Sequence, residues 1–159
     1  MPTLSHVRDR IIRQTYREVL PGKFDSTAAT VMLLAIGLQE SRFEHRLQIG
    51  GPARGFWQFE RGGGVLGVLN HPSTVRQAKA LCVLRGVSPT PTEVYRAIAD
   101  DDLLACGMAR LLLWTDPRDL PLPGDEEGAW DLYLRVWRPG KPHRSTWGEL
   151  YQQALEGLA

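Results

Sequence analysis

Glu40 is the residue whose type and position are best suited to proton-transfer chemistry. It ends an apolar stretch, residues 31–39, and Leu33, Ile36 and Gly37 precede it at helical spacing. A carboxyl on such a face is partly removed from water, and it also meets the negative end of the helix dipole. Both effects raise its pKa, so it can stay protonated near neutral pH and donate a proton to a leaving group. Taken alone, Glu40 is more simply a carboxylate that turns outward to solvent.

A second motif, residues 55–58, comes after Glu40 and a glycine-containing loop and favours the chemical interpretation. Gln58 contributes an amide and Trp57 an aromatic face, and together they suit a sugar ring, which has polar edges and apolar faces. We assign the two neighbouring phenylalanines to core packing, which is also the alternative for Trp57.

These residues resemble the catalytic core of soluble lytic transglycosylases and goose-type lysozymes. Those proteins carry a Glu-Ser pair at a helix end, here Glu40-Ser41, and then a Gly-x-x-Gln segment, here residues 55–58. Residues 105–113 resemble the buried helix of the family more weakly. The segment 137–140, Trp-Arg-Pro-Gly, falls where the family has Tyr-Asn-x-Gly and departs from it at two of the three fixed positions. Either Trp137 or Tyr133 therefore takes the place of the family's tyrosine.

The resemblance covers about residues 26–140 and implies a function. We expect an all-α, lysozyme-like single domain over residues 1–159, with a central buried helix and a substrate cleft. It would cleave the β-1,4 bond between N-acetylmuramic acid and N-acetylglucosamine in peptidoglycan glycan strands, as a lytic transglycosylase (a lyase) or a lysozyme (a hydrolase), without metal or cofactor. Glu40 would be the general acid and base. The substrate-binding residues would be Ser41, Trp57, Gln58 and one or both of Tyr133 and Trp137.

Hydrolysis of a glycosidic bond normally uses a second carboxyl, about 5 to 5.5 Å away for retention and about 6.5 to 9.5 Å for inversion. Glu60 is our first candidate and Glu44 the second. Carboxylates at i and i+4 are more often solvated like charges, and Glu60 beside Arg61 is also explained as a surface pair. Family members that act as transglycosylases need one glutamate only, because the N-acetyl and 6-hydroxyl groups of the sugar complete the reaction to an anhydro product. The sequence leaves both mechanisms open.

Helices separated by glycine and proline must position these residues. An apolar stripe from Leu4 to Val19 predicts a first helix, and Asp25 or Ser26 caps a second that carries Glu40. Residues 44–56 form a loop, and the flexible tract Arg61–Gly64 interrupts the segment after the second motif. We expect further helices from Ser73 to Gly86, after Thr90, over residues 101–115, and over residues 125–137, with a capping box of Thr146 and Glu149 opening the last.

The C-terminal part is rich in aromatic residues. Trp130, Tyr133 and Trp137 share one helical face, an arrangement that is more often core than ligand platform. Arg138 and Lys141, which lie beside prolines, are better placed to meet acidic peptide stems or a partner protein.

Charge and cysteine content exclude several functions. A formal net charge of +1, from 19 basic and 18 acidic residues, gives no general attraction to nucleic acid. Cys82 and Cys106 stand apart in apolar helical surroundings, which indicates buried free thiols. The four histidines are scattered, so we infer no metal site.

The first residues of the sequence lack the apolar core of a signal peptide, and no apolar run approaches the ~18 residues of a membrane span. We therefore expect a protein that is made in the cytoplasm, does not insert into a membrane and reaches the periplasmic cell wall by another route. Phage endolysins and virion-borne enzymes are delivered in this way. A phage protein, virion-associated or released at lysis, with other virion proteins as further partners, fits this expectation.

Two other functions are open on the sequence alone. The chain can be a non-enzymatic structural protein of the virion, in the tail or the interior, that keeps a lysozyme-like fold, because a fold does not establish an activity. Cleavage of chitin is the second, and it differs mainly in tolerance for the lactyl group and stem peptide.

Overall fold

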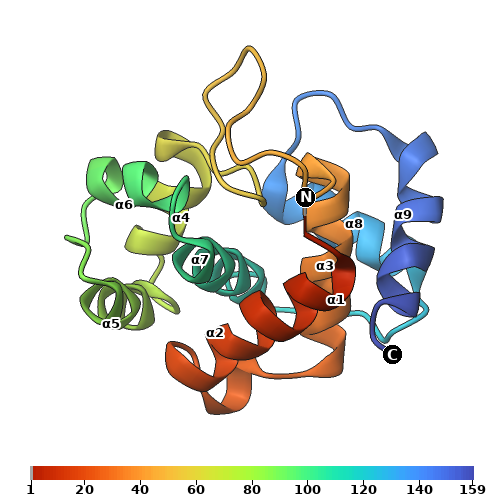
Figure 1. Ribbon diagram of the computed structural model, residues 1–159, viewed down its shortest axis with the longest axis horizontal. Coiled ribbons are helices and arrows are strands. Elements are labelled where there is room, and N and C mark those ends of the chain that lie inside the picture. Colours follow the sequence, from red (N-terminus) through yellow and green to blue (C-terminus); the bar gives the residue numbers. More distant parts are fainter. Residues whose placement is uncertain (1) are drawn as a thin grey trace.

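In the computed structural model, which describes residues 2–159, the apolar helix expected over residues 101–115 lies at the centre of the molecule as α7 (Asp102–Trp114) (Figure 1). Residues 104–113 of this helix are all buried. Asp101 caps its first turn, where the carboxylate accepts the Leu104 N–H at 3.0 Å. Helices α2 to α6 all contact α7. The prediction of a central buried helix is confirmed.

Residues 2–159 form eight helices. The first is continuous through α1, η1 and α2, and η3 likewise runs on into α4, while η2 is a single short turn. Within residues 2–159 the β-pairing amounts to two isolated bridges, and no sheet forms. The remaining elements are α1 (Leu4–His6), η1 (Val7–Ile12), α2 (Arg13–Glu18), η2 (Gly22–Phe24), α3 (Thr27–Ser41), η3 (Arg61–Val65), α4 (Leu66–Asn70), α5 (Val75–Arg85), α6 (Pro91–Ile98), α8 (Glu126–Trp137) and α9 (Arg144–Glu156).

The helix that carries Glu40, α3, is enclosed for most of its length. The hydroxyl of Ser26 accepts the Ala29 N–H at 3.1 Å, so Ser26 is the N-cap, one of the two residues expected for it. All residues from 29 to 38 are buried, and α3 packs along α9 and against η1 and α7. Arg42 ends the helix in the left-handed region, with φ 56°. Packing on several sides therefore fixes where the Glu40 end of α3 points.

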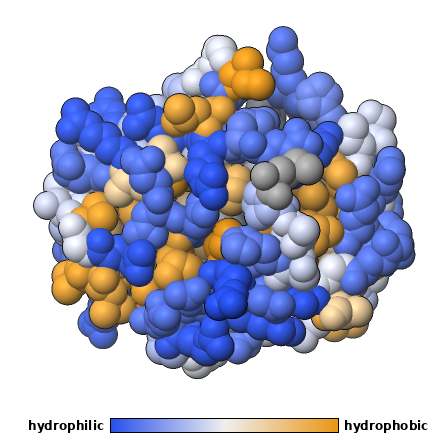
Figure 2. Space-filling model, viewed as in Figure 1, coloured by the Kyte–Doolittle hydropathy of each residue, from blue (hydrophilic) through white to orange (hydrophobic). Residues whose placement is uncertain are grey.

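Residues 42–60 rise above the helices as a long loop, in agreement with the loop expected over 44–56 (Figure 1). Two isolated bridges, Leu47–Arg54 and Arg54–Phe59, close it on itself. Figure 2 shows apolar surface over this loop and around α5, where the exposed large apolar residues include Leu47, Ile49 and Val83. Over residues 2–159, no helix has the length and apolar composition that crossing a membrane requires.

One expectation about a helix start holds in part and another is wrong. The tract Arg61–Gly64 belongs to the turn η3 that leads into α4, but the backbone is interrupted there by a kink at Gly63, whose φ of −101° and ψ of −106° are not helical. Helix α5 takes Thr74 and not Ser73 as its N-cap, since the Ser73 hydroxyl lies 2.7 Å from Nδ1 of His71 and is engaged there.

The capping box expected at the last helix is also absent. Helix α9 begins at Arg144, so Thr146 lies inside it. The Thr146 hydroxyl donates to Oε1 of Gln39 at 3.0 Å, and Nε2 of Gln39 donates to the His143 carbonyl at 3.1 Å. The box is absent because Thr146 is not at the helix start, and its hydroxyl links α9 to α3.

Gly37 lets the chain fold back over α3 immediately after Glu40, because a Cβ there would overlap the ring of Phe43. We predict that Gly37→Ala lowers the free energy of unfolding by about 1–3 kcal/mol through overpacking, although alanine is otherwise the better helix former. Denaturant titration measures the change. Gly148→Ala, whose Cβ would lie 3.4 Å from Glu126, is the control and should be neutral or stabilising. Equal stabilisation by both changes would contradict this packing.

Candidate active site

The Glu40 carboxyl is half-buried at the end of α3 and meets Tyr133 of α8. The Tyr133 hydroxyl donates to Oε1 of Glu40 at 2.8 Å. Burial raises the pKa of Glu40 to about 7, against the lowering effect of that hydrogen bond. The pKa of Tyr133 is raised by burial and by the neighbouring Glu40 charge. Glu40 therefore exchanges a proton near neutral pH, while the phenol stays protonated and acts as a donor only.

Ser41 joins the end of α3 to the second motif. Its buried Oγ lies 2.7 Å from the Phe56 carbonyl oxygen, to which it donates, and it accepts the Phe43 N–H at 3.1 Å. By resemblance we expect Ser41 to bind substrate. In the structure Ser41 holds the end of α3 instead, because a buried hydroxyl engaged on both sides does not face a ligand.

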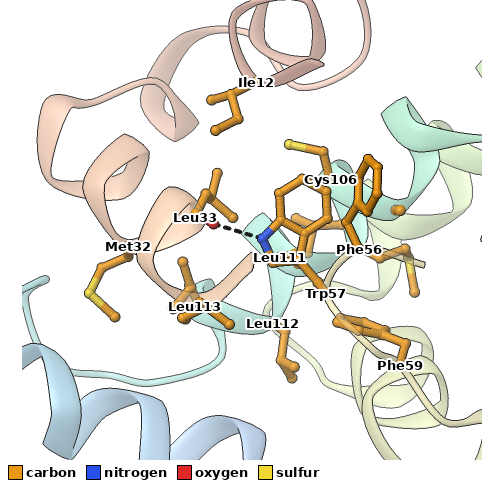
Figure 3. Close-up of a cluster of buried hydrophobic side chains, with 14 of the residues drawn as sticks. Ile12, Met32, Leu33, Phe56, Trp57, Phe59, Cys106, Leu111, Leu112 and Leu113 are labelled. Atoms are coloured by element: carbon orange, nitrogen blue, oxygen red, sulfur yellow. Dashed lines mark hydrogen bonds between the residues drawn. The ribbon is translucent and has the colours of Figure 1, made fainter. Parts of the chain in front are cut away.

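The Trp57 ring packs in the core. Its side chain is 1% exposed, and the indole N–H donates to the Leu33 carbonyl of α3 at 2.9 Å (Figure 3). Phe43 and Phe56 surround it with ring centroids 5.7 and 6.4 Å away. The core alternative considered for Trp57 therefore holds, and its ring presents no face to a sugar.

Gln58 is half-buried in the turn of residues 55–58, with a positive φ of 54°. Its Nε2 donates to the Gly55 carbonyl at 3.0 Å, so the side-chain amide folds back onto residues 55–58. Within residues 2–159 its Oε1 accepts no hydrogen bond, so that oxygen is available to a ligand hydroxyl or amide.

Tyr133 and Trp137, one helical turn apart on α8, have separate roles. Tyr133 contacts Glu40, whereas the Trp137 indole donates to the Trp57 carbonyl at 3.0 Å. Tyr133 also stacks on Trp147 of α9, with ring centroids 5.3 Å apart. Of the two residues left open by the sequence, Tyr133 is the one placed on the acid, and Trp137 holds the second motif.

Strained backbone gathers around Glu40. Within residues 2–159 four residues other than glycine have positive φ: Arg42, Phe43, Gln58 and Arg138. Arg42 and Phe43 directly follow Glu40-Ser41, Gln58 belongs to the second motif, and Arg138 ends α8 just after Trp137. Such conformations cost of order 1–3 kcal/mol each and cluster at functional sites. The sequence carries no signal for this feature, since none of the four is a residue that favours positive φ.

A cavity of about 650 Å³ adjoins the site at Trp137. Glu60 lines it and is exposed, but Glu40, Tyr133 and Gln58 are not among its lining residues. The cavity therefore shares Trp137 with the surroundings of the second motif but does not include the Glu40–Tyr133 pair. Glu44 lines a different cavity of about 500 Å³, next to α9.

The larger cavity also contains an ion pair that sequence reasoning missed, that of Asp116 with Arg135. The Asp116 side chain is 10% exposed and its oxygens lie 3.2 and 3.3 Å from the Arg135 guanidinium. The two residues come from different segments, and nothing local in the sequence predicts their contact.

Comparisons of the chain with protein-family models, curated proteins and solved structures give no match. Cys82 and Cys106 are free and buried, as expected. Within residues 2–159, no three His, Cys, Asp or Glu side chains are grouped as metal ligands would be.

Tyr133→Phe should raise the pKa of Glu40 above about 7. The phenol stabilises the carboxylate, so its loss should shift the titration upward by about one pH unit, the equivalent of one hydrogen bond. NMR titration of ¹³C-labelled glutamate measures the midpoint. Tyr95→Phe, which removes a hydroxyl bonded to Pro52 instead, is the control and should leave Glu40 unchanged. A lower or unaltered midpoint in Tyr133→Phe would contradict the contact.

Glu40 should also make stability depend on pH. Its pKa is about 7 in the folded protein and 4.5 for an unperturbed glutamate, so the folded state binds the extra proton between these limits. The fold consequently loses stability as pH rises through that window, and Glu40→Gln does not. We predict that the variant gains roughly 3 kcal/mol relative to wild type between about pH 4 and pH 8. Urea titrations at a series of pH values measure the difference, and a constant difference would show that Glu40 is not desolvated.

Proposed function

We propose that the protein is a peptidoglycan-degrading glycosidase that cleaves the β-1,4 bond between N-acetylmuramic acid and N-acetylglucosamine. One observation carries the proposal: the Glu40 carboxyl, with a pKa of about 7, is held by Tyr133 at a helix end that Ser41 ties to the Gly-x-x-Gln turn. The resemblance of the two motifs to lytic transglycosylases and goose-type lysozymes agrees with this arrangement of side chains.

In the reaction, protonated Glu40 donates its proton to the oxygen that bridges the two sugars. The bond from that oxygen to the muramic acid C1 breaks, and the bonding electrons leave with the oxygen. Glu40 is then a carboxylate, and the hydrogen bond from Tyr133 stabilises its charge. In the second stage the same carboxylate removes a proton from the group that attacks C1. The Oε1 of Gln58 accepts a hydrogen bond from the sugar.

The surroundings of Glu40 favour the muramic acid 6-hydroxyl over water as the attacking group. A paired carboxylate would repel Glu40 and raise its pKa by charge, as in known dyads. Within residues 2–159 the pKa of Glu40 is changed by burial and by the hydrogen bond from Tyr133, and not by a second carboxylate. Glu60 lies in the adjoining cavity, and Asp116 is paired with Arg135. A site with one titrating carboxyl fits a lytic transglycosylase that releases 1,6-anhydro products.

Digestion of purified Gram-negative peptidoglycan by wild type, Glu40→Gln and Glu60→Gln, followed by mass spectrometry of the soluble muropeptides, tests the proposal. We expect anhydro products from wild type and from Glu60→Gln, and a loss of at least about 100-fold in Glu40→Gln, since general acid–base catalysis contributes about 10²–10⁴-fold. Products with reducing ends, lost in both variants, would instead indicate a lysozyme with Glu60 as the second carboxyl.

The alternative of a non-enzymatic structural virion protein makes a distinct prediction in the same experiment. Wild type would then release no muropeptides at any pH across the range in which Glu40 titrates, while its pH-dependent stability would still show the desolvated Glu40. That combination would overturn the enzymatic assignment.

A further inference from the structure

Helix α9 packs against both helices that carry the Glu40–Tyr133 pair. Glu40 lies at the end of α3 and Tyr133 belongs to α8, and α9 contacts both of these helices (Figure 1). Within residues 2–159, α3 and α8 have little direct contact with each other. The distance between the acid and the phenol therefore depends on how each of the two helices is attached to α9.

Gln39, the residue before Glu40, attaches α3 to the first turn of α9. Its Nε2 donates to the His143 carbonyl at 3.1 Å, and its Oε1 accepts a hydrogen bond from the Thr146 hydroxyl at 3.0 Å. Both ends of one amide are thus engaged by a single turn of helix, so the amide can neither rotate nor move away without losing a hydrogen bond. The end of α3 that carries the acid is consequently fixed against the start of α9.

Trp147, the next residue along α9, attaches the same turn to Tyr133. The two rings lie 10° from parallel with centroids 5.3 Å apart, and Trp147 is 0% exposed. Trp147 is itself held by two contacts. Its indole N–H donates to the Glu126 carbonyl at the start of α8 at 3.2 Å, and its ring stacks on Tyr151 with centroids 6.0 Å apart. Stacking on a fixed ring restricts how Tyr133 can turn, and therefore where its hydroxyl lies.

The charged side chain of this turn is directed elsewhere. Arg144 forms ion pairs with Glu126, at 2.8 Å, and with Glu127, both at the start of α8. Within residues 2–159 the pKa of Glu40 is changed by burial and by the Tyr133 hydrogen bond, and not by Arg144. An effect of the first turn of α9 on Glu40 must therefore pass through Tyr133 or through the position of α3.

We propose that Trp147 is a positioning residue, which holds the Tyr133 hydroxyl on Glu40, and that the Gln39–Thr146 link keeps Trp147 in place relative to the acid. Trp147 acts through Tyr133, because a fully buried ring meets no substrate. The catalytic consequence rests on the proposed function: in that reaction the carboxylate form of Glu40 needs the Tyr133 hydroxyl. The positioning itself does not rest on it.

NMR titration of ¹³C-labelled glutamate tests the role of Trp147. Trp147→Phe should raise the midpoint of Glu40 by about half a pH unit, the partial loss of one hydrogen bond. In the Tyr133→Phe background the same change should have no effect, because no phenol remains to be positioned. Leu81→Ala, a core truncation on α5, is the control for lost stability and should leave the midpoint unchanged.

A purely structural role for Trp147 gives a different result. Loosened packing admits water, which lowers the pKa of a buried acid. An unchanged or lowered midpoint in Trp147→Phe would therefore overturn the proposal, as would a shift that persists without the Tyr133 hydroxyl.

Thr146→Val tests the link to Gln39, and it decides the matter if Trp147→Phe does not fold. Valine keeps the shape of the side chain and removes the hydroxyl, so the midpoint of Glu40 should rise as it does in Trp147→Phe. Thr146→Ser, which retains the hydroxyl, should restore the wild-type midpoint. Equal midpoints in Thr146→Val and wild type would refute the link.

Kinetics on soluble glycan strands measure the catalytic consequence. Half a pH unit corresponds to about a threefold change, so kcat of Trp147→Phe should fall about threefold with KM unchanged, because Trp147 does not touch substrate. An unaltered kcat would confine Trp147 to the fold and overturn its catalytic role. The titration needs no substrate, so a shifted Glu40 midpoint without any cleavage by wild type would sustain the positioning and refute the proposed activity.

Discussion

The buried Ser41 hydroxyl is the contact on which the geometry of the site depends. It bonds the end of α3 to the Phe56 carbonyl, 15 residues further along the chain. The turn held there offers the Trp57 carbonyl to Trp137, and α8 in turn brings the Tyr133 hydroxyl to Glu40. These three hydrogen bonds close a circuit through both motifs and α8. Because its members are buried or half-buried, opening any of them leaves polar groups without partners.

Several features of this circuit oppose stability. A carboxyl is kept among apolar groups, and the residues after it, Arg42 and Phe43, take strained backbone conformations. Packing of the Trp57 ring against α3 and the surrounding phenylalanines offsets these costs (Figure 3). Functional sites often contain groups in unfavourable states because the chemistry needs them there. Packing of the neighbouring residues then holds these groups in place. The core under the second motif is therefore part of the site's support.

The sequence predicted features that are local and failed where partners are distant. Apolar periodicity and capping residues such as Ser26 placed most helices, and the apolar face of α3 was enough to anticipate the raised pKa of Glu40. The capping box failed because α9 begins at Arg144, before Thr146, and the Gln39 amide, 104 residues away, bonds the His143 carbonyl at that start. The sequence could not decide whether Tyr133 or Trp137 contacts Glu40, because both lie on the same face of α8. Only the placement of α8 in the fold determines that Tyr133 reaches the acid.

The choice of a phenol as the partner of Glu40 has a chemical consequence. A second carboxylate would titrate together with Glu40 and share its proton, whereas burial raises the pKa of Tyr133 and keeps it a donor throughout. The pair therefore has one ionisation near neutral pH. A reaction in which a single group first gives a proton and then takes one back needs that property, because the same atom must be stable in both states. Apolar surroundings stabilise the acid form, and the Tyr133 hydroxyl stabilises the base form.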